Sequence, residues 1–179
     1  LGEELLEWGR DTFDLDINEF YGQTEANLLV ANCSELMEAK PGSMGRAVPG
    51  HVVEVLNEEG CPCDVGTVGE VAVLSPDPVM FLGYWGNDEA TSEKFSGKWC
   101  LTGDLATRDE AGYFWFVGRK DDVIISSGYR IGPAEIEECL IKHPQVALSA
   151  VIGVPDEVRT EVVKAFVVLK SGAVAGPLL

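Results

Sequence analysis

The sequence contains very little histidine: of its 179 residues, two are histidines, His51 and His143. Few residues are therefore available for catalysis by a Ser–His or Cys–His pair, and a zinc motif with two closely spaced histidines is absent. His143 precedes Pro144 at an expected helix end, where the helix dipole stabilises a cation, so we interpret it as structural. His51 has no recognisable partner in the sequence. Any chemistry must rest mainly on other residue types.

Basic residues are also scarce. The chain has 13 Lys and Arg against 30 Asp and Glu, which gives a formal net charge of −17. Binding along a nucleic-acid backbone or to an anionic membrane needs clustered Lys and Arg that displace counterions, so neither is expected as a partner. A negative total still allows local anion sites. The apolar content of 46% favours a folded globular protein.

Two further absences concern location. No apolar run reaches the roughly 18 residues of a membrane helix, and the amino end lacks the basic and apolar regions of an export signal. The cysteines are odd in number and lack the spacing of a disulfide framework, which favours reduced thiols and a cytoplasmic location. They are Cys33, Cys61, Cys63, Cys100 and Cys139. The pair in Cys61-Pro62-Cys63 is only a weak metal signal, because zinc-binding cysteines are usually spaced differently.

The first two thirds of the chain combine helices with short strands. Apolar side chains at near-helical spacing predict a helix over residues 3–13, and a short helix is expected over 87–95. Strands are expected where β-forming residues are bounded by turn residues, at 52–56, 69–74, around Trp99 and at 113–117. The alternation of short strands and turns between about residues 42 and 82 predicts a small barrel or sandwich.

The pattern changes after Arg119. Apolar runs rich in β-branched residues favour strands, and a proline is well suited to the first position of a helix. The expected order is a strand at 123–126, a loop at 128–132, a helix that begins at Pro133, and two strands at 147–154 and 162–169. The chain is therefore predicted to be a mixed α+β protein with two parts, residues 1–120 and residues 121–179.

Three polar motifs follow one another along the chain. Each is weak alone, because such runs of Thr, Gly and Asp commonly close loops and turns. They are Glu19-Phe20-Tyr21-Gly22-Gln23-Thr24-Glu25, then Leu101-Thr102-Gly103-Asp104, and finally Gly118-Arg119-Lys120-Asp121-Asp122 with the following Ser126-Ser127-Gly128-Tyr129-Arg130-Ile131-Gly132-Pro133. Together, at these separations, they resemble the adenylate-forming (AMP-binding) enzymes, and most closely the medium-chain acyl-CoA synthetases.

The resemblance extends from Gly2 to about Lys170 and implies an architecture. Residues 1–120 would be the C-terminal part of a large AMP-binding domain with a small β-barrel-like subdomain, and residues 121–179 the first part of a small, mobile α+β domain. Asp121 matches the hinge about which the small domain rotates. The family's phosphate loop and catalytic Lys have no counterpart in the sequence. It therefore resembles a fragment, and we expect these residues alone to make no acyl-CoA.

The resemblance also assigns the nucleotide site. Tyr21 would stack on adenine, a contact worth about 1–3 kcal/mol by analogy with base stacking. Thr24 would reach the α-phosphate, and Glu25 would hold Mg²⁺, which binds phosphates with few protein ligands. Asp104 would accept hydrogen bonds from both ribose hydroxyls. Taken alone, Tyr21 could pack in a core and Glu25 could be a solvated loop acid.

Two arginines and several flanking residues complete this implied site. Arg119 would face the ribose and phosphates, and Arg130 would approach the phosphate as a permanently charged fork. Each arginine alone could be a surface salt bridge. The remaining members are Gly2, Glu3, Glu19, Phe20, Gly22 and Gln23. Gly2-Glu3 resembles a Gly-Glu-Pro segment that closes the adenine pocket, although Glu4 here occupies the position of the proline.

The implied reaction has two halves. A small-molecule carboxylic acid attacks the α-phosphate of ATP to give acyl-AMP and pyrophosphate, and the thiol of coenzyme A then displaces AMP. Such chemistry depends on placement and charge compensation more than on a protein nucleophile. The catalytic residues would be Thr24, Glu25 and Arg130, with ATP, Mg²⁺ and coenzyme A required. The coenzyme A site would comprise Ser127, Gly128, Tyr129 and Arg159.

Gly22 bears on the size of the carboxylic acid that the implied reaction would use. In short-acyl members of the family, a bulky aromatic side chain at this position closes the acyl pocket. Since Gly22 has no side chain, we expect a deeper pocket and a medium-chain, branched or aromatic acid.

Three other functions share some of these motifs. An adenylation domain would load a carrier protein instead of free coenzyme A, although the sequence of residues 126–133 favours a free-CoA ligase. A luciferase-like oxidase would consume oxygen or emit light. A non-catalytic remnant would bind ATP without turning it over.

Overall fold

The structure is a computed structural model that describes residues 3–173 and 175–176, and it divides into two compact units. Unit 1 comprises Leu1–Phe116 and unit 2 comprises Val117–Leu179. The division lies a few residues before the boundary predicted at 120/121. Each unit is described by itself below.

Unit 1 is built on two sheets. The first has the order β1-β2-β3, and the second has the order β4-β5-β7-β6 with β8 also paired to β7. The strands are β1 (Phe20–Gln23), β2 (Ala26–Ala31), β3 (Arg46–Ala47), β4 (Val53–Leu56), β5 (Gly69–Leu74), β6 (Phe95–Ser96), β7 (Trp99–Arg108) and β8 (Phe114–Arg119). The last of them, β8, begins in unit 1 and ends in unit 2. None of the sheets in the described part of the chain closes on itself. Of the small barrel or sandwich expected between residues 42 and 82, the closed barrel is therefore corrected to open sheets.

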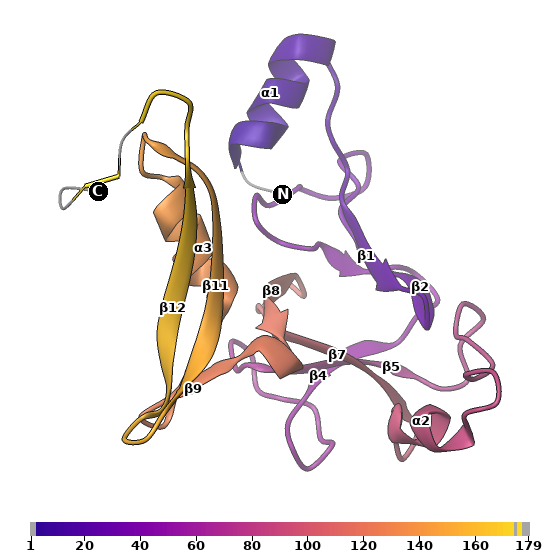
Figure 1. Cartoon of the computed structure of the whole chain (residues 1–179). Coiled ribbons are helices and arrows are strands. Elements are labelled where there is room, and N and C mark those ends of the chain that lie inside the picture. Colours follow the sequence, from indigo (N-terminus) through magenta and orange to yellow (C-terminus); the bar gives the residue numbers. More distant parts are fainter. Residues whose placement is uncertain (1–2, 174, 177–179) are drawn as a thin grey trace. The chain divides into compact units, whose positions relative to one another are not determined.

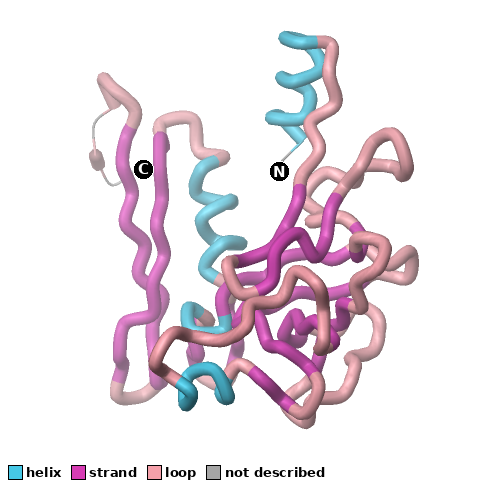
Figure 2. Tube along the Cα trace, turned by 90° about the vertical axis from the view of Figure 1, so that its right-hand side faces the viewer, coloured by secondary structure: helices cyan, strands magenta, loops and turns pink. Residues whose placement is uncertain are grey.

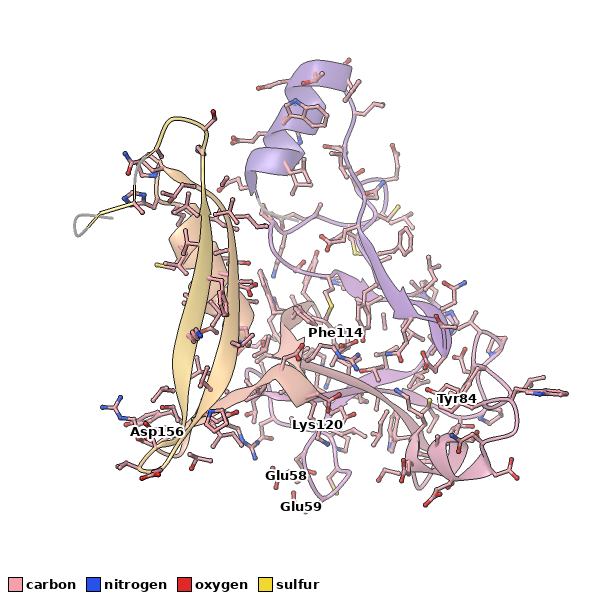
Figure 3. The ribbon with its side chains drawn as sticks, in the orientation of Figure 1. Glu58, Glu59, Tyr84, Phe114, Lys120 and Asp156 are labelled. Atoms are coloured by element: carbon pink, nitrogen blue, oxygen red, sulfur yellow. The ribbon has the colours of Figure 1, made fainter. Side chains whose placement is uncertain are left out.

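The two sheets of unit 1 share one apolar core. β5 lies between β4 and β7, and five of its six residues are buried, as expected of a central strand. Inward and outward side chains alternate along β7, which is the pattern of a half-buried strand. The core contains Ala26, Leu29 and Val30 from the first sheet, Val53, Val55, Val71, Val73, Cys100, Ala106 and Phe114 from the second, and Met44 between them in sequence. The position of Phe114 is labelled in Figure 3.

The predicted amino-terminal helix is confirmed as α1 (Glu3–Phe13). It projects from the sheets of unit 1 and joins them through the segment before β1 (Figures 1 and 2). Within it, Trp8 and Phe13 lie edge to face at 5.2 Å, and Leu6 is buried. No helix in the described ranges is both long and apolar enough to cross a membrane.

His51, for which the sequence offers no partner, forms a buried pair in unit 1. Its Nδ1 lies 2.7 Å from Oδ2 of Asp77, and the two side chains are only 9% and 3% exposed. The other carboxylate oxygen of Asp77 accepts a hydrogen bond from the backbone N–H of Val79 at 3.0 Å. This pair therefore anchors the segment that leads to residues 79–84.

A second polar cluster in unit 1 centres on Asp109. Lys40 Nζ lies 2.8 Å from Asp109 Oδ2, and the backbone N–H of Tyr113 donates to Oδ1 at 2.9 Å. The Lys40 ammonium also lies 4.2 Å from the centre of the Tyr113 ring. The hydrogen bond from Lys40, helped by the one from Tyr113, lowers the pKa of Asp109 to about 2.

This depressed pKa makes the stability of unit 1 depend on pH. A carboxyl whose folded pKa lies below its unfolded value of about 3.9 contributes stability above that value, and the contribution is lost as the pH falls towards the folded pKa. We expect Asp109→Asn to lower the melting temperature at pH 7, with the difference from the parent disappearing between about pH 4 and pH 2. Thermal melts at several pH values measure this. Glu110→Gln, an exposed neighbour, is the control, and an Asp109→Asn deficit that persists at pH 2 would contradict the assignment.

Unit 2 is a four-stranded antiparallel sheet with the order β10-β9-β12-β11, with one helix against β11 (Figure 1). Its elements are the short 3-10 turn η1 (Lys120–Asp122), β9 (Ile124–Ser126), β10 (Tyr129–Ile131), α3 (Pro133–Ile141), β11 (Val146–Asp156) and β12 (Thr160–Leu169). The helix start at Pro133 and both long strands are confirmed. Residues 129–131 were expected in a loop but form β10, paired with β9.

Candidate functional site

The first motif forms the tight β1–β2 hairpin of unit 1. Gln23 pairs with Ala26, so Thr24 and Glu25 occupy the turn between the strands. Along β1, Phe20 and Gly22 face outward, while Tyr21 and Gln23 are partly buried. Thr24 is exposed. The hairpin therefore presents several of the residues predicted to bind ATP from one short segment.

Gly22 has a backbone reason to be glycine. The pairing of β1 with β2 is irregular between Tyr21 and Gln23, and a Cβ at Gly22 would lie 2.4 Å from the backbone nitrogen of Leu28. Real side chains never approach a backbone so closely, so this position excludes them for packing reasons. The absence of a side chain at Gly22 consequently has an explanation that is independent of the acyl pocket.

The second motif forms a bulge in β7. Glu70 pairs with Leu105 and Ala72 pairs with Leu101, so Thr102, Gly103 and Asp104 together face a single residue of β5, Val71. The bulge is held from both ends: Thr102 Oγ1 donates to the Val71 carbonyl at 2.8 Å, and Glu70 Oε1 accepts from the backbone N–H of Gly103 at 2.9 Å. The bulge leaves Thr102 and Asp104 both buried, so the alternation along β7 continues through it.

The two motifs of unit 1 meet at this bulge. The hydroxyl of Tyr21 donates to Oδ2 of Asp104 at 2.6 Å, and Nε2 of Gln23 donates to the carbonyl of Thr102 at 3.0 Å. Asp104 is only 6% exposed. Burial, with the neighbouring Asp104 carboxylate, raises the pKa of the Tyr21 hydroxyl far above its usual value, so Tyr21 stays protonated and donates. The predicted adenine and ribose residues are thus direct neighbours.

Glu25, the predicted metal ligand, is in contact with a residue that the sequence motifs did not include. The hydroxyl of Tyr84 donates to Oε1 of Glu25, and the backbone N–H of Phe81 donates to the Glu25 carbonyl at 2.8 Å. The hydrogen bond to Glu25, with partial burial, raises the pKa of Tyr84 to about 12. Glu70 was missed in the same way. Both lie in stretches that resemble ordinary strand or loop sequence, so only the fold identifies them.

An open hollow of about 390 Å³ lies beside the β1–β2 hairpin. Its lining consists of Phe20, Gly22, Gln23, Thr24 and Asn27. Four of these five residues belong to the first predicted motif.

Unit 2 brings together the residues predicted to bind coenzyme A. Ser127 and Gly128 form the turn between β9 and β10, with φ angles of 51° and 84°, as in tight hairpin turns with two left-handed residues. The backbone N–H of Ser127 donates to the carbonyl of Arg159 at 2.9 Å. Arg159 is itself held by Asp156, whose Oδ1 accepts its backbone N–H at 2.8 Å (Figure 3 labels Asp156). Tyr129 follows the turn and is 74% exposed.

The remaining predicted residues are more scattered. Arg119 and Asp121 lie in unit 2, where their side chains form an exposed pair at 3.9 Å, which contributes little stability. Arg130 is exposed in the middle of β10. Glu3 is the first residue of α1 and is exposed. Gly2 lies outside the described residues.

The first Glu of the hairpin motif, Glu19, supports its base. Its carbonyl accepts the backbone N–H of Asn32 at 2.8 Å, which ties the start of β1 to the end of β2.

The part of the chain that the structure describes holds no group of three His, Cys, Asp or Glu side chains suited to a metal ion. A single carboxylate such as Glu25 nevertheless fits Mg²⁺ bound to a nucleotide, since phosphates and waters then supply most of its ligands.

Solved structures with this fold define its class. The ATP-bound MatB structure from Rhodopseudomonas palustris matches 98% of this chain with a TM-score of 0.89 and 34% identity, and the match covers 35% of that chain. The MenE O-succinylbenzoate coenzyme A synthetase from Bacillus subtilis, in complex with ATP and magnesium ion, matches 99% with a TM-score of 0.86 and 31% identity, over 36% of its own chain. The fold is that of the adenylate-forming enzymes.

Sequence comparison gives the family. One family model, described as AMP-binding enzyme, matches residues 1–85, and a second, AMP-binding enzyme C-terminal domain, matches residues 135–178. The chain belongs to the AMP-binding enzyme family.

Two curated relatives are similar over most of the chain. The uncharacterized acyl–CoA ligase YtcI of Bacillus subtilis is 46% identical over 171 residues, which is 96% of this chain and 32% of the relative. The mitochondrial acyl-coenzyme A synthetase ACSM3 of Rattus norvegicus is 48% identical over 172 residues, 94% of this chain and 30% of the relative. The chain thus spans about a third of the length of these relatives.

Proposed function

We propose that the complete protein containing this chain is an ATP-dependent, AMP-forming acyl-CoA ligase. The observation that supports this most directly is the contact between Tyr21 and Asp104, which places an aromatic face beside a carboxylate fixed in a bulge. An adenosine needs both, because its base stacks and its two ribose hydroxyls donate. The similarity to acyl-CoA synthetases supports the same reaction.

The proposed reaction has two steps. A carboxylate oxygen of the acid attacks the α-phosphorus of ATP, the bond to the pyrophosphate oxygen breaks, and acyl-AMP and pyrophosphate result. The thiolate sulfur of coenzyme A then attacks the acyl carbon and AMP leaves, while the thiol proton passes to solvent. Thr24 would orient the α-phosphate, and Arg130 would balance its charge. When bound through Glu25, Mg²⁺ would neutralise part of the triphosphate charge.

We also propose which role each of the two parts of the chain has in this reaction. Residues 1–120 would belong to the large nucleotide-binding domain and residues 121–179 to the small domain. Rotation about Asp121 would move Arg130 away from the phosphates. It would bring the Ser127–Tyr129 turn and Arg159 to coenzyme A. The hydrogen bond between Ser127 and Arg159 supports this, because it keeps the proposed coenzyme A residues together as one group.

The function is tested on the protein encoded by the complete reading frame that contains this chain, hereafter the complete protein. With ATP, Mg²⁺ and a panel of acids, we expect pyrophosphate release, and acyl-CoA only when coenzyme A is added. Mass spectrometry of the products measures both. Acyl transfer to a carrier protein but not to coenzyme A would overturn the ligase assignment, and ATP binding without pyrophosphate release would identify a non-catalytic protein.

The acid is proposed to be medium-chain, branched or aromatic. The resemblance of the three motifs to medium-chain acyl-CoA synthetases supports this class, and Gly22 lines the hollow beside the hairpin. Because any side chain at Gly22 would strain the hairpin, the panel of acids is the better test than a substitution there. A cytoplasmic location stays a prediction from the cysteine content.

A further inference from the structure

Residues 79–84 of unit 1 lie directly beside the turn that carries Glu25. The backbone N–H of Asn27 donates to the Val79 carbonyl at 3.3 Å, and the backbone N–H of Phe81 donates to the Glu25 carbonyl at 2.8 Å. Ala26 and Met80 form an isolated antiparallel bridge between these two contacts. The segment thus runs beside Glu25, Ala26 and Asn27 and fixes the backbone there.

Tyr84, at the end of this segment, is held independently of Glu25. Its backbone N–H donates to Oγ1 of Thr91 at 2.9 Å, and Thr91 lies in the short helix α2 (Asp88–Glu93). Figure 3 labels Tyr84 close to this helix. Its ring packs edge to face on Phe81, with ring centres 5.0 Å apart. The direction of the Tyr84 hydroxyl is therefore set by its own surroundings.

That hydroxyl donates to Oε1 of Glu25. A glutamate side chain has several rotatable bonds, and ordering it costs conformational entropy. Because the Tyr84 hydroxyl is already fixed, it reduces the freedom that the Glu25 side chain must still lose when a ligand binds.

We propose that Tyr84 is a positioning residue, which orients the Glu25 carboxylate for magnesium-bound ATP. This proposal rests on the proposed function, in which Glu25 contacts the metal. Because Oε1 of Glu25 accepts the hydrogen bond from Tyr84, the metal would contact the other carboxylate oxygen. This suits Mg²⁺, which keeps several waters and binds few protein ligands. Hydrogen-bond partners of this kind, behind a metal ligand, commonly change metal affinity by ~10–100-fold.

The test is Tyr84→Phe in the complete protein, which removes the hydroxyl and keeps the ring on Phe81. Binding of Mn²⁺ in the presence of a non-hydrolysable ATP analogue, measured by electron paramagnetic resonance, is expected to weaken by ~10–100-fold. The Mg²⁺ concentration for half-maximal pyrophosphate release should rise in parallel, and saturating Mg²⁺ should restore the rate. The KM for the carboxylic acid should not change. Unchanged Mn²⁺ affinity in a folded Tyr84→Phe protein would overturn the proposal.

Two controls separate this from other causes. Tyr113→Phe also deletes a hydrogen-bonded tyrosine hydroxyl, here to the Glu38 carbonyl, and should leave Mn²⁺ binding unchanged. Thr91→Val loosens the anchor of Tyr84 without touching Glu25 and should shift Mn²⁺ affinity in the same direction, so it replaces Tyr84→Phe if that variant does not fold. A shift of equal size in Tyr113→Phe would show a general structural effect and overturn the proposal.

Glu25→Gln distinguishes this inference from the proposed function. If Glu25→Gln weakens Mn²⁺ binding and Tyr84→Phe does not, the metal role of Glu25 holds and the positioning role of Tyr84 is wrong. If Glu25→Gln itself has no effect on Mn²⁺ binding, the metal role of Glu25 is wrong, and the role of Tyr84 is overturned with it.

Discussion

Asp104→Ala in the complete protein is expected to lower kcat/KM for ATP by about 100- to 10,000-fold. The carboxylate would accept two ribose hydroxyls, and a hydrogen bond to a charged group contributes about 1.5–3 kcal/mol. The alanine would also leave the buried hydroxyl of Tyr21 without its acceptor at 2.6 Å. Asp104→Asn retains an acceptor oxygen and should lose less. Pyrophosphate release at varied ATP, with ATP binding by calorimetry, measures the effect.

Asp64→Ala is the matched control for this prediction. Asp64 is an exposed aspartate of unit 1, and its carbonyl, not its side chain, accepts the N–H of Thr67 in a turn. We expect parental kinetics from it. If Asp104→Ala folds and still matches Asp64→Ala in kcat/KM for ATP, the ribose assignment is wrong.

Gly45→Ala is expected to destabilise unit 1 so strongly that no cooperative unfolding transition remains. Gly45 has φ 99°, and a Cβ there would lie 2.0 Å from the Ala31 carbonyl oxygen. Its carbonyl accepts the N–H of Phe114 at 2.8 Å, so the residue sits between the end of β2 and the start of β8. Relieving the overlap must separate the two sheets. We expect a cost above about 4 kcal/mol, which is exceptional for one substitution.

Gly50→Ala isolates the steric part of that effect. Gly50 has nearly the same φ, 103°, but a Cβ there meets no atom within 4 Å. Only the backbone strain of about 1–3 kcal/mol should appear. Urea denaturation of both variants and the parent, followed by circular dichroism, gives the comparison. If the two substitutions lower the free energy of unfolding equally, close packing around Gly45 is not the cause of the effect.

The sequence predicted best those elements whose signal is local. The start of α3 follows from Pro133, and β11 and β12 follow from two β-branched runs, since both depend on the residues within the element. β10 was missed because its three residues lie between glycines, and its strand character comes from pairing with β9. Of the small barrel or sandwich expected between residues 42 and 82, the closed barrel is not formed in the described part of the chain. Closure depends on which strands pair, and periodicity does not determine pairing.

The candidate site shows the same limit. The resemblance pointed to Tyr21 and Asp104, and the structure makes them neighbours. It could not indicate Glu70 or Tyr84, because one holds a bulge from an adjacent strand and the other reaches Glu25 from a distant loop. Gly22 illustrates the opposite case: a residue chosen for substrate size has a close backbone contact that already requires glycine. Supporting residues are defined by three-dimensional contacts, so sequence motifs omit them.

The hydrogen bond between Tyr21 and Asp104 joins residues 83 positions apart, and this separation has a consequence for synthesis of the chain. Contacts between distant residues close long loops, and they form after local structure because loop closure costs entropy. A nascent chain that already carries Tyr21 lacks the carboxylate until Asp104 has left the ribosome. Nucleotide affinity would then arise late, once both sheets are in place, and nucleotide retention by ribosome-bound chains would report the completion of unit 1.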